Sequence, residues 1–231
     1  MQVLDKVSGV RVISGDPIAA WEQVEEPLKF DVKNPVKEAN PELTEKQRKQ
    51  KTYGLSLWMK MFFNPKTQLP DEFVSVKKDN GGTVLAILET GEVLLVEQFK
   101  QAKGVIALEC VAFMPKEGSD LATSALEELK SEAGVAAGTF DELAGGNVWL
   151  AARKIDTEEA TYVATGCRVV GNPQQDKGEI IRVYAVTQEA LWGLIDDGTI
   201  RTAGTLAAIF RAHRAGYLDN AVYQKGMKQR G

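Results

Sequence analysis

The clearest pattern of apolar positions is a pair of β-type runs at residues 83–88 and 93–99, joined by the loop Glu89-Thr90-Gly91-Glu92. A short loop that contains glycine between two such runs is typical of a β-hairpin. Further apolar or strand-type runs occur at 105–114, 147–151, 161–165 and 180–186, and helical patterns occur at 119–133, 188–196 and 205–215. Because helices interrupt the strands singly, the pattern predicts a mixed α/β fold with helices on the faces of a mixed sheet.

The N-terminal third of the chain has a weaker pattern. Short β-branched runs at 8–14 and 28–32 predict two strands. Residues 33–51 are polar without apolar periodicity, which indicates a surface loop or an exposed helix. Apolar and aromatic residues return at 53–63, and Asn64-Pro65 ends that segment. These features predict an N-terminal β-rich element.

Composition and charge exclude several classes of partner. The 231 residues are 44% hydrophobic and 26% charged, which is typical of a globular protein. A net charge of −4 provides no general attraction for nucleic acid or anionic lipid. No run approaches the roughly 18 apolar residues of a membrane helix, and the N-terminus lacks the apolar region of a signal peptide. We therefore expect a cytoplasmic protein with neither nucleic acid nor membrane partners.

Among the side chains that could carry out chemistry, the carboxylates are the main candidates. The 2 cysteines, Cys110 and Cys167, are too few for a zinc cluster or a disulfide framework and fit a reducing compartment. The single histidine, His213, excludes a two-histidine metal motif, and its Ala-rich helical context predicts a solvated surface position. Neither a GxxxxGK[ST] nor a GxGxxG motif occurs in the chain.

The helix predicted from Ser119 to Ala133 has clear start and stop signals. Ser119 or Asp120 can cap its first turn, and Gly134 stands where a left-handed terminating residue belongs. At about 100° per residue, one arc of the helix is apolar and the opposite arc is polar. The apolar arc holds Leu121, Ala122, Ala125, Leu126, Leu129 and Ala133, and the polar arc holds Thr123, Ser124, Glu127, Lys130 and Ser131.

Two acidic residues, Glu128 and Glu132, lie on the edge of the apolar arc, four positions apart. Like charges at this spacing repel by a few tenths of a kcal/mol in water, and by more where water is excluded. A divalent cation would reverse the sign of that interaction. The alternative is a pair of solvated acids that Lys116 and Lys130 screen.

Residues 113–135 resemble the Nudix box, whose pattern is G-x5-E-x7-R-E-U-x-E-E-x-G-U with U a bulky aliphatic residue. The stretch Leu126–Val135 falls on the centre of this pattern. The resemblance extends in order over residues 81–215 to the ADP-ribose pyrophosphatase branch of the family. Its further segments are Leu94–Lys100, Leu108–Ala112, Gly178–Val183, Gly198–Ile200 and Thr205–Ala208. The resemblance implies a Nudix-type α/β/α sandwich.

The box is degenerate. Phe113 replaces its first glycine, Ser119 its first glutamate, Glu127 its arginine and Ser131 the first glutamate of its Glu-Glu pair. In the family that arginine orients a metal-binding glutamate, whereas a carboxylate at position 127 adds repulsion. These departures bear on function more than on fold.

The resemblance also implies a ligand set and a reaction. The Glu128 and Glu132 carboxylates and the backbone carbonyl of Ala112 would bind Mg²⁺ or Mn²⁺, a set of hard oxygen donors. Glu179 would be the catalytic base with Asp176 as its substitute, and a plain charge at a strand edge is the alternative for Glu179. Two weaker candidates contact substrate, namely Lys100 and Glu109. Two tryptophans, Trp58 and Trp149, either stack on a base or belong to the core.

Two functions follow from these residues. The first is metal-dependent hydrolysis of a nucleoside diphosphate linked to another moiety, as in ADP-ribose. The alternative is a catalytically impaired Nudix-fold protein that binds a nucleotide or a partner without cleaving it. Residues 1–80 form the β-rich extension and residues 81–231 the Nudix domain. We expect the extension to form a homodimer, because it is too small to bury its own core and carries Trp21, Trp58, Phe62 and Phe63.

Overall fold

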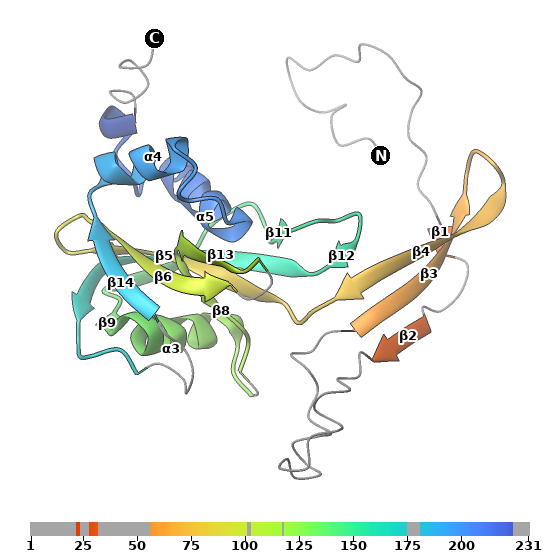
Figure 1. Ribbon diagram of the computed structural model, residues 1–231, viewed down its shortest axis with the longest axis horizontal. Coiled ribbons are helices and arrows are strands. Elements are labelled where there is room, and N and C mark those ends of the chain that lie inside the picture. The colour runs from red at the N-terminus through yellow and green to blue at the C-terminus, as the bar shows by residue number, and fades with distance from the viewer. Residues whose placement is uncertain are drawn as a thin grey trace. The chain divides into compact units, whose positions relative to one another are not determined.

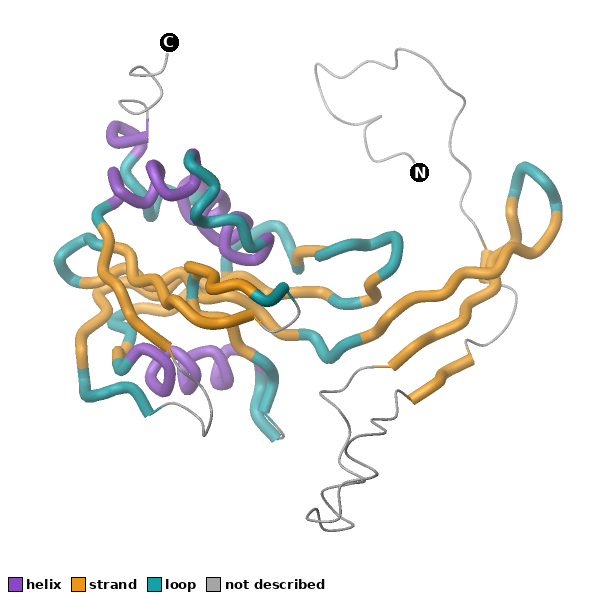
Figure 2. The backbone as a smooth tube through the Cα atoms, in the orientation of Figure 1, coloured by secondary structure: helices purple, strands orange, loops and turns teal. Residues whose placement is uncertain are grey.

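The computed structural model of the chain has two units, Met1–Lys77 and Lys78–Gly231, shown in Figure 1 and, by secondary structure, in Figure 2. It describes the backbone of residues 22–23, 28–31, 56–100, 103–116, 118–174 and 181–223, with side chains from residue 56 onward in those ranges. The predicted strand at 8–14 and the polar segment 33–51 lie outside the described residues.

The first unit is an antiparallel sheet around one long strand. Its strands are β1 (Glu22–Gln23), β2 (Leu28–Asp31), β3 (Ser56–Asn64) and β4 (Leu69–Lys77). β3 pairs with each of the other three, and it ends at Asn64, as the Asn-Pro signal predicts. β2 confirms the strand predicted near residue 28. The sequence pattern does not predict β4, because Pro70, Asp71 and Glu72 interrupt its apolar alternation.

The second unit contains a mixed sheet in the order β10-β13-β5-β6-β14. β13 and β5 pair in parallel, whereas β5 and β6 form the predicted antiparallel hairpin. The predicted run at 105–114 is two strands, because the chain leaves β6 at Cys110 and then pairs with β5. The strands of this sheet are β5 (Gly81–Leu88), β6 (Val93–Lys100), β7 (Val105–Glu109), β8 (Val111–Phe113), β9 (Val135–Ala136), β10 (Thr139–Glu142), β11 (Val148–Trp149), β13 (Glu158–Val169) and β14 (Ile181–Val186). The short strand β12 (Ile155–Asp156) is not part of it.

Helices cover both faces of this sheet, with α3 (Leu121–Ala133) on one face and α4 (Gln188–Asp196) and α5 (Ala203–Arg214) on the other (Figure 1). Successive residues of β5 alternate between the two layers of core. Val84 and Ala86 belong to the cluster under α3, and Leu85 and Ile87 belong to the cluster under α4 and α5. Both faces of β5 are therefore buried, which explains its nearly continuous apolar sequence.

The ends of α3 are set by local chemistry. Of the two predicted caps, Asp120 is the one that the structure uses: its Oδ1 accepts a hydrogen bond from the backbone N–H of Thr123 at 2.7 Å. Gly134 ends the helix in the left-handed region with φ 67°. A Cβ at Gly134 would lie 2.4 Å from the carbonyl oxygen of Gly171, so both its φ and its close packing require glycine.

The buried face of α3 differs in two positions from the predicted arc. Ala125 and Leu129 are fully buried as predicted, but Leu126 is 38% exposed. Ser124, predicted on the solvent side, is fully buried. The hydroxyl of Ser124 has hydrogen-bond partners on both sides, so its burial satisfies the polar group.

The two C-terminal helices match their predicted patterns closely. α4 spans the predicted residues, and α5 begins two residues earlier than predicted. None of the helices in the described part of the chain is long and apolar enough to cross a membrane.

Candidate functional site

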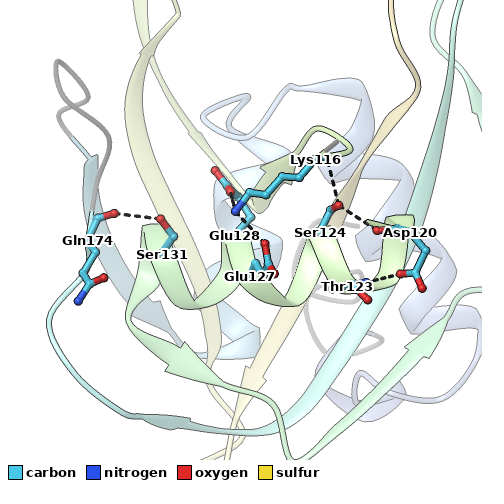
Figure 3. A network of polar contacts seen from close by, with 8 residues as sticks. All are labelled: Lys116, Asp120, Thr123, Ser124, Glu127, Glu128, Ser131 and Gln174. Carbon is cyan, nitrogen blue, oxygen red and sulfur yellow. Dashed lines mark hydrogen bonds and ion pairs between the residues drawn. The ribbon is translucent and has the colours of Figure 1, made fainter. Parts of the chain in front are cut away.

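A polar network fixes the loop before α3 onto the first turns of that helix (Figure 3). The backbone N–H of Lys116 donates to the Ser124 hydroxyl at 3.1 Å, and this hydroxyl donates to the carbonyl of Asp120 at 2.9 Å. The carbonyl of Lys116 accepts from the N–H of Ser119 at 3.0 Å. Lys116 therefore starts from a backbone position that the buried Ser124 holds in place.

The side chain of Lys116 reaches along α3 to two acids. Its Nζ lies 3.1 Å from Glu127 Oε2 and 3.5 Å from Glu128 Oε2. Desolvation by itself would lower the pKa of Lys116, but the Glu127 and Glu128 carboxylates outweigh it and raise the pKa above its ordinary value. The lysine is thus a firmly charged partner of both acids. The sequence pattern indicates Lys116 only as a screening charge in the neighbourhood.

The predicted metal ligands come from two neighbouring elements. Glu128 and Glu132 lie one helical turn apart on α3, and Ala112 lies on β8, which packs against α3. Glu132 is only 4% exposed, while the Glu128 side chain is 23% exposed. The position of both acids at the edge of the apolar arc is therefore observed, and one of the two is buried.

The donor set fits a hard divalent cation. Two carboxylates and a backbone carbonyl offer oxygen ligands only, as Mg²⁺ or Mn²⁺ prefers. Among the described residues, no group of three or more His, Cys, Asp or Glu side chains is placed to hold a metal ion. A metal site here would therefore need the Ala112 carbonyl, water, or an acid from the segment 175–180. The predicted bases Glu179 and Asp176 belong to that segment and lie outside the described residues.

The chain that leads into this segment is attached to α3. Ser131 Oγ donates to the carbonyl of Gln174 at 2.9 Å, and the N–H of Gln174 donates to the carbonyl of Ser131 at 2.8 Å. The serine that stands at a glutamate position of the box therefore holds Gln174, the residue that precedes the segment 175–180. A cavity of about 640 Å³ lies beside this contact. Its lining includes Lys116, Glu127, Lys130, Ser131 and residues 170–174.

Lys100 and Glu109, the predicted substrate contacts, form an ion pair with each other across the β6–β7 hairpin. The Glu109 side chain is 6% exposed, and Lys100 is 31% exposed. Gln98 Nε2 also donates to Glu109 Oε1 at 3.1 Å. Glu109 is therefore a buried acid with two partners, and the Lys100 side chain is partly exposed.

Glu159 is an acid near this pair that the sequence pattern does not single out. Burial raises its pKa, Glu109 raises it further, and Lys78 and Lys100 act in the opposite direction. A Cβ at Gly204 of α5 would lie 2.8 Å from Glu159 Oε2, so the start of α5 packs directly over this carboxylate. No motif in the sequence marks Glu159, because its surroundings come from segments far apart in the chain.

Of three predictions about aromatic side chains, those for His213 and Trp149 have definite outcomes. His213 is half-buried and not solvated as predicted, because its ring packs against Trp192 and Tyr223 at centroid distances of 5.3 and 4.8 Å. Trp149 is 68% exposed and so is not a core residue. Its Nε1–H donates to Glu158 Oε1 at 3.0 Å, which fixes the indole at the surface. Trp58 is half-buried.

No protein-family model matches the chain, and no curated protein is significantly similar in sequence. Among solved structures, the chain is similar to the crystal structure of an ADP compounds hydrolase, with a TM-score of 0.63 and 12% identity. The match covers 88% of this chain and 100% of the other. At this identity the likeness establishes the fold alone, and it confirms the predicted class: the chain has a mixed α/β fold of the Nudix type.

Proposed function

We propose that the chain is a metal-dependent hydrolase of the diphosphate bond in a nucleoside diphosphate linked to another moiety, with ADP-ribose as the type of substrate. The observation that carries this proposal is the burial of the Glu132 carboxylate one turn from Glu128 on α3. A carboxylate is costly to remove from water, and a second acid one turn away adds repulsion. A divalent cation bound between the two carboxylates would offset both costs. The likeness to an ADP compounds hydrolase supports the choice of substrate class.

The carboxylates of Glu128 and Glu132 and the carbonyl of Ala112 would hold Mg²⁺ or Mn²⁺. The bound ion would neutralise charge that develops on the diphosphate and favour ionisation of a water molecule. The remaining contributions come from the chain itself. Glu179, or Asp176 in its place, would accept the proton of the attacking water. The hydrogen bonds between Ser131 and Gln174 hold the residue before that segment against α3.

Lys100 would attract a phosphate oxygen of the substrate. Its ion pair with the buried Glu109 restricts the ammonium group to the end of β6. A lysine that is already placed loses less freedom when it binds an anion. Glu109 in this role positions Lys100 and does not itself contact the phosphates.

A second candidate function is nucleotide binding without turnover. The observation in its favour is the Lys116 ammonium beside Glu128, together with Glu127 at the arginine position of the box. A lysine paired with a metal-binding acid competes with the metal, and position 127 cannot supply an orienting cation. In this second candidate function, the cavity still binds a nucleotide but the diphosphate bond is not cleaved.

A screen of nucleoside diphosphate derivatives separates the two candidates. The purified full chain is incubated with each compound and Mg²⁺ or Mn²⁺, and a phosphomonoesterase then releases phosphate from the terminal groups that cleavage exposes. We expect phosphate release with the wild type. In Glu132→Gln the rate should fall by more than about 100-fold, because losing a metal ligand should cost more than losing a residue that only orients one. The matched control is Glu142→Gln, which removes an exposed acid of β10. Substrate binding by calorimetry without any release would favour the second candidate.

Restoring the box tests the same proposal from the opposite direction. Glu127→Arg with Ser131→Glu should raise the rate of hydrolysis by about 10–100-fold, the usual effect of residues that orient metal ligands. Ser131→Glu also removes the hydrogen bond from the Ser131 hydroxyl to the Gln174 carbonyl. If neither the wild type nor the restored variant binds Mg²⁺ or Mn²⁺ in calorimetry, hydrolysis by this site is contradicted.

A further inference from the structure

Lys116 occupies an unusual place among the charges of α3. Three acids, Glu127, Glu128 and Glu132, lie within six residues of this helix. The Lys116 ammonium comes from the preceding loop and contacts the first two of them (Figure 3). Its contact with Glu128 is made to the carboxylate that the proposed function assigns to a metal ion. A cation from the chain therefore already lies beside this carboxylate.

Hydrogen bonds of the backbone fix the position from which the Lys116 side chain starts. The Lys116 N–H is bound to Ser124, which is fully buried. The turn that follows is tight, since Gly118 has φ 80° and the Ser119 N–H returns to the Lys116 carbonyl. The backbone of Lys116 is therefore anchored on both sides, whereas its side chain keeps rotatable bonds. Lys116 can therefore leave Glu128 and remain beside Glu127 without any change in the loop.

The two contacts differ in a way that permits such a movement. The Nζ atom is nearer to Glu127, at 3.1 Å, than to Glu128, at 3.5 Å. The Lys116 and Glu127 side chains are both nearly half exposed, at 46% and 49%, whereas Glu128 is 23% exposed. Glu127 thus keeps the lysine in solvent-accessible surroundings when Glu128 takes another partner.

We propose that Lys116 is the built-in counter-ion of Glu128, which a divalent cation must displace, so that Lys116 sets the metal affinity of the site. This inference rests on the proposed function, because the metal is the one assigned to Glu128 and Glu132. Two electrostatic effects of the lysine both weaken metal binding. Its ion pair must be broken before Glu128 binds a metal, and its positive charge then repels the metal nearby. Removing the lysine therefore strengthens metal binding.

The test is a comparison of Mn²⁺ affinity by calorimetry in the metal-free full chain and its variants. Lys116→Met keeps the length of the aliphatic side chain and removes the charge. We expect it to bind Mn²⁺ roughly five- to tenfold more tightly than the wild type. Lys116→Arg keeps the charge and should stay within about twofold. Lys130→Met makes the same change in net charge at a position on α3 itself, and it should also stay within about twofold of the wild type.

The outcomes separate this inference from the proposed function. If the wild type binds Mn²⁺ and Lys116→Met binds it equally or more weakly, the counter-ion role is wrong and the metal site stands. An equal gain in Lys130→Met would also overturn it, because net charge alone would then explain the effect. If no variant binds Mn²⁺, the inference and the metal site fail together. Where hydrolysis is measurable, the Mg²⁺ concentration for half-maximal rate should fall in Lys116→Met by the same factor as the affinity rises.

Discussion

The sheet of the first unit and the sandwich of the second differ sharply in how far they bury apolar side chains. In the second unit Leu85, Leu95 and Leu129 are fully buried, and two core clusters fill the layers on either side of the sheet. Among residues 56–77, the side chains that the structure describes in the first unit, only Ser56 is buried. Leu69 is 63% exposed in the same unit. The second unit therefore has a core of its own, whereas a strand pair such as β3–β4 gains little stability by itself.

The largest expected effect is the loss of a core side chain in the second unit. Leu129→Ala on α3 should lower the free energy of unfolding by about 2–5 kcal/mol, because it leaves a cavity beneath the helix. Leu126→Ala, on the same helix but 38% exposed, should cost only about 0.5 kcal/mol. Chemical denaturation of both variants measures the difference. Equal losses would show that α3 does not bury the face that carries Leu129.

The apolar surface of the first unit leads to a prediction about assembly. Leu57, Leu69, Phe73 and Val74 are each more than a third exposed, and we expect a second copy of the chain to cover this surface. Light scattering at micromolar concentration should give twice the chain mass of 25.2 kDa. Val74→Lys should shift the protein toward the monomer, with less than about 1 kcal/mol lost from the stability of the second unit. A monomeric wild type would contradict the prediction.

The sequence predicts the elements of the second unit better than its polar contacts. The hairpin of β5 and β6 and the end of α3 at Gly134 follow from local signals, namely alternating apolar residues and a glycine stop. Burial of Ser124 does not follow, because its hydroxyl is satisfied by Lys116, which belongs to the preceding loop. Helical periodicity assigns a residue to a face from its position in the helix, and it contains no information about a hydrogen-bond partner from another segment.

In the candidate site, too, the sequence predicts the placement of residues along an element but not their contacts with other elements. The spacing of Glu128 and Glu132 is by itself enough to place both acids on one side of α3. The burial of Glu132 to 4% exposure and the contact of Lys116 with Glu128 depend on how the sheet and the loop pack against the helix. Distances between side chains of separate elements are tertiary facts. They decide here which acid is buried and which already has a cation beside it.

The smallest predicted effect concerns the exposed cap of α3 at Asp120. The Asp120 carboxylate accepts a hydrogen bond from the backbone N–H of Thr123, and this bond lowers the pKa of Asp120 below its ordinary value of 3.8. Because the folded state favours the charged carboxylate, the contribution is fully present above the unfolded pKa, near pH 4, and is lost as the pH falls through the lower, folded pKa.

Asp120→Asn keeps an oxygen that can accept the capping hydrogen bond but removes the charge that interacts with the helix N-terminus. We expect its Tm to lie slightly below that of the wild type at pH 7, by less than the change in Leu129→Ala. The gap should close as the pH falls below about 4 and through the lowered pKa of Asp120, because the wild-type carboxyl then becomes neutral as well. Thermal unfolding of both proteins across this range measures the gap. A gap that stays constant with pH would mean that the charge of Asp120 contributes nothing, and that the cap acts through its hydrogen bond alone.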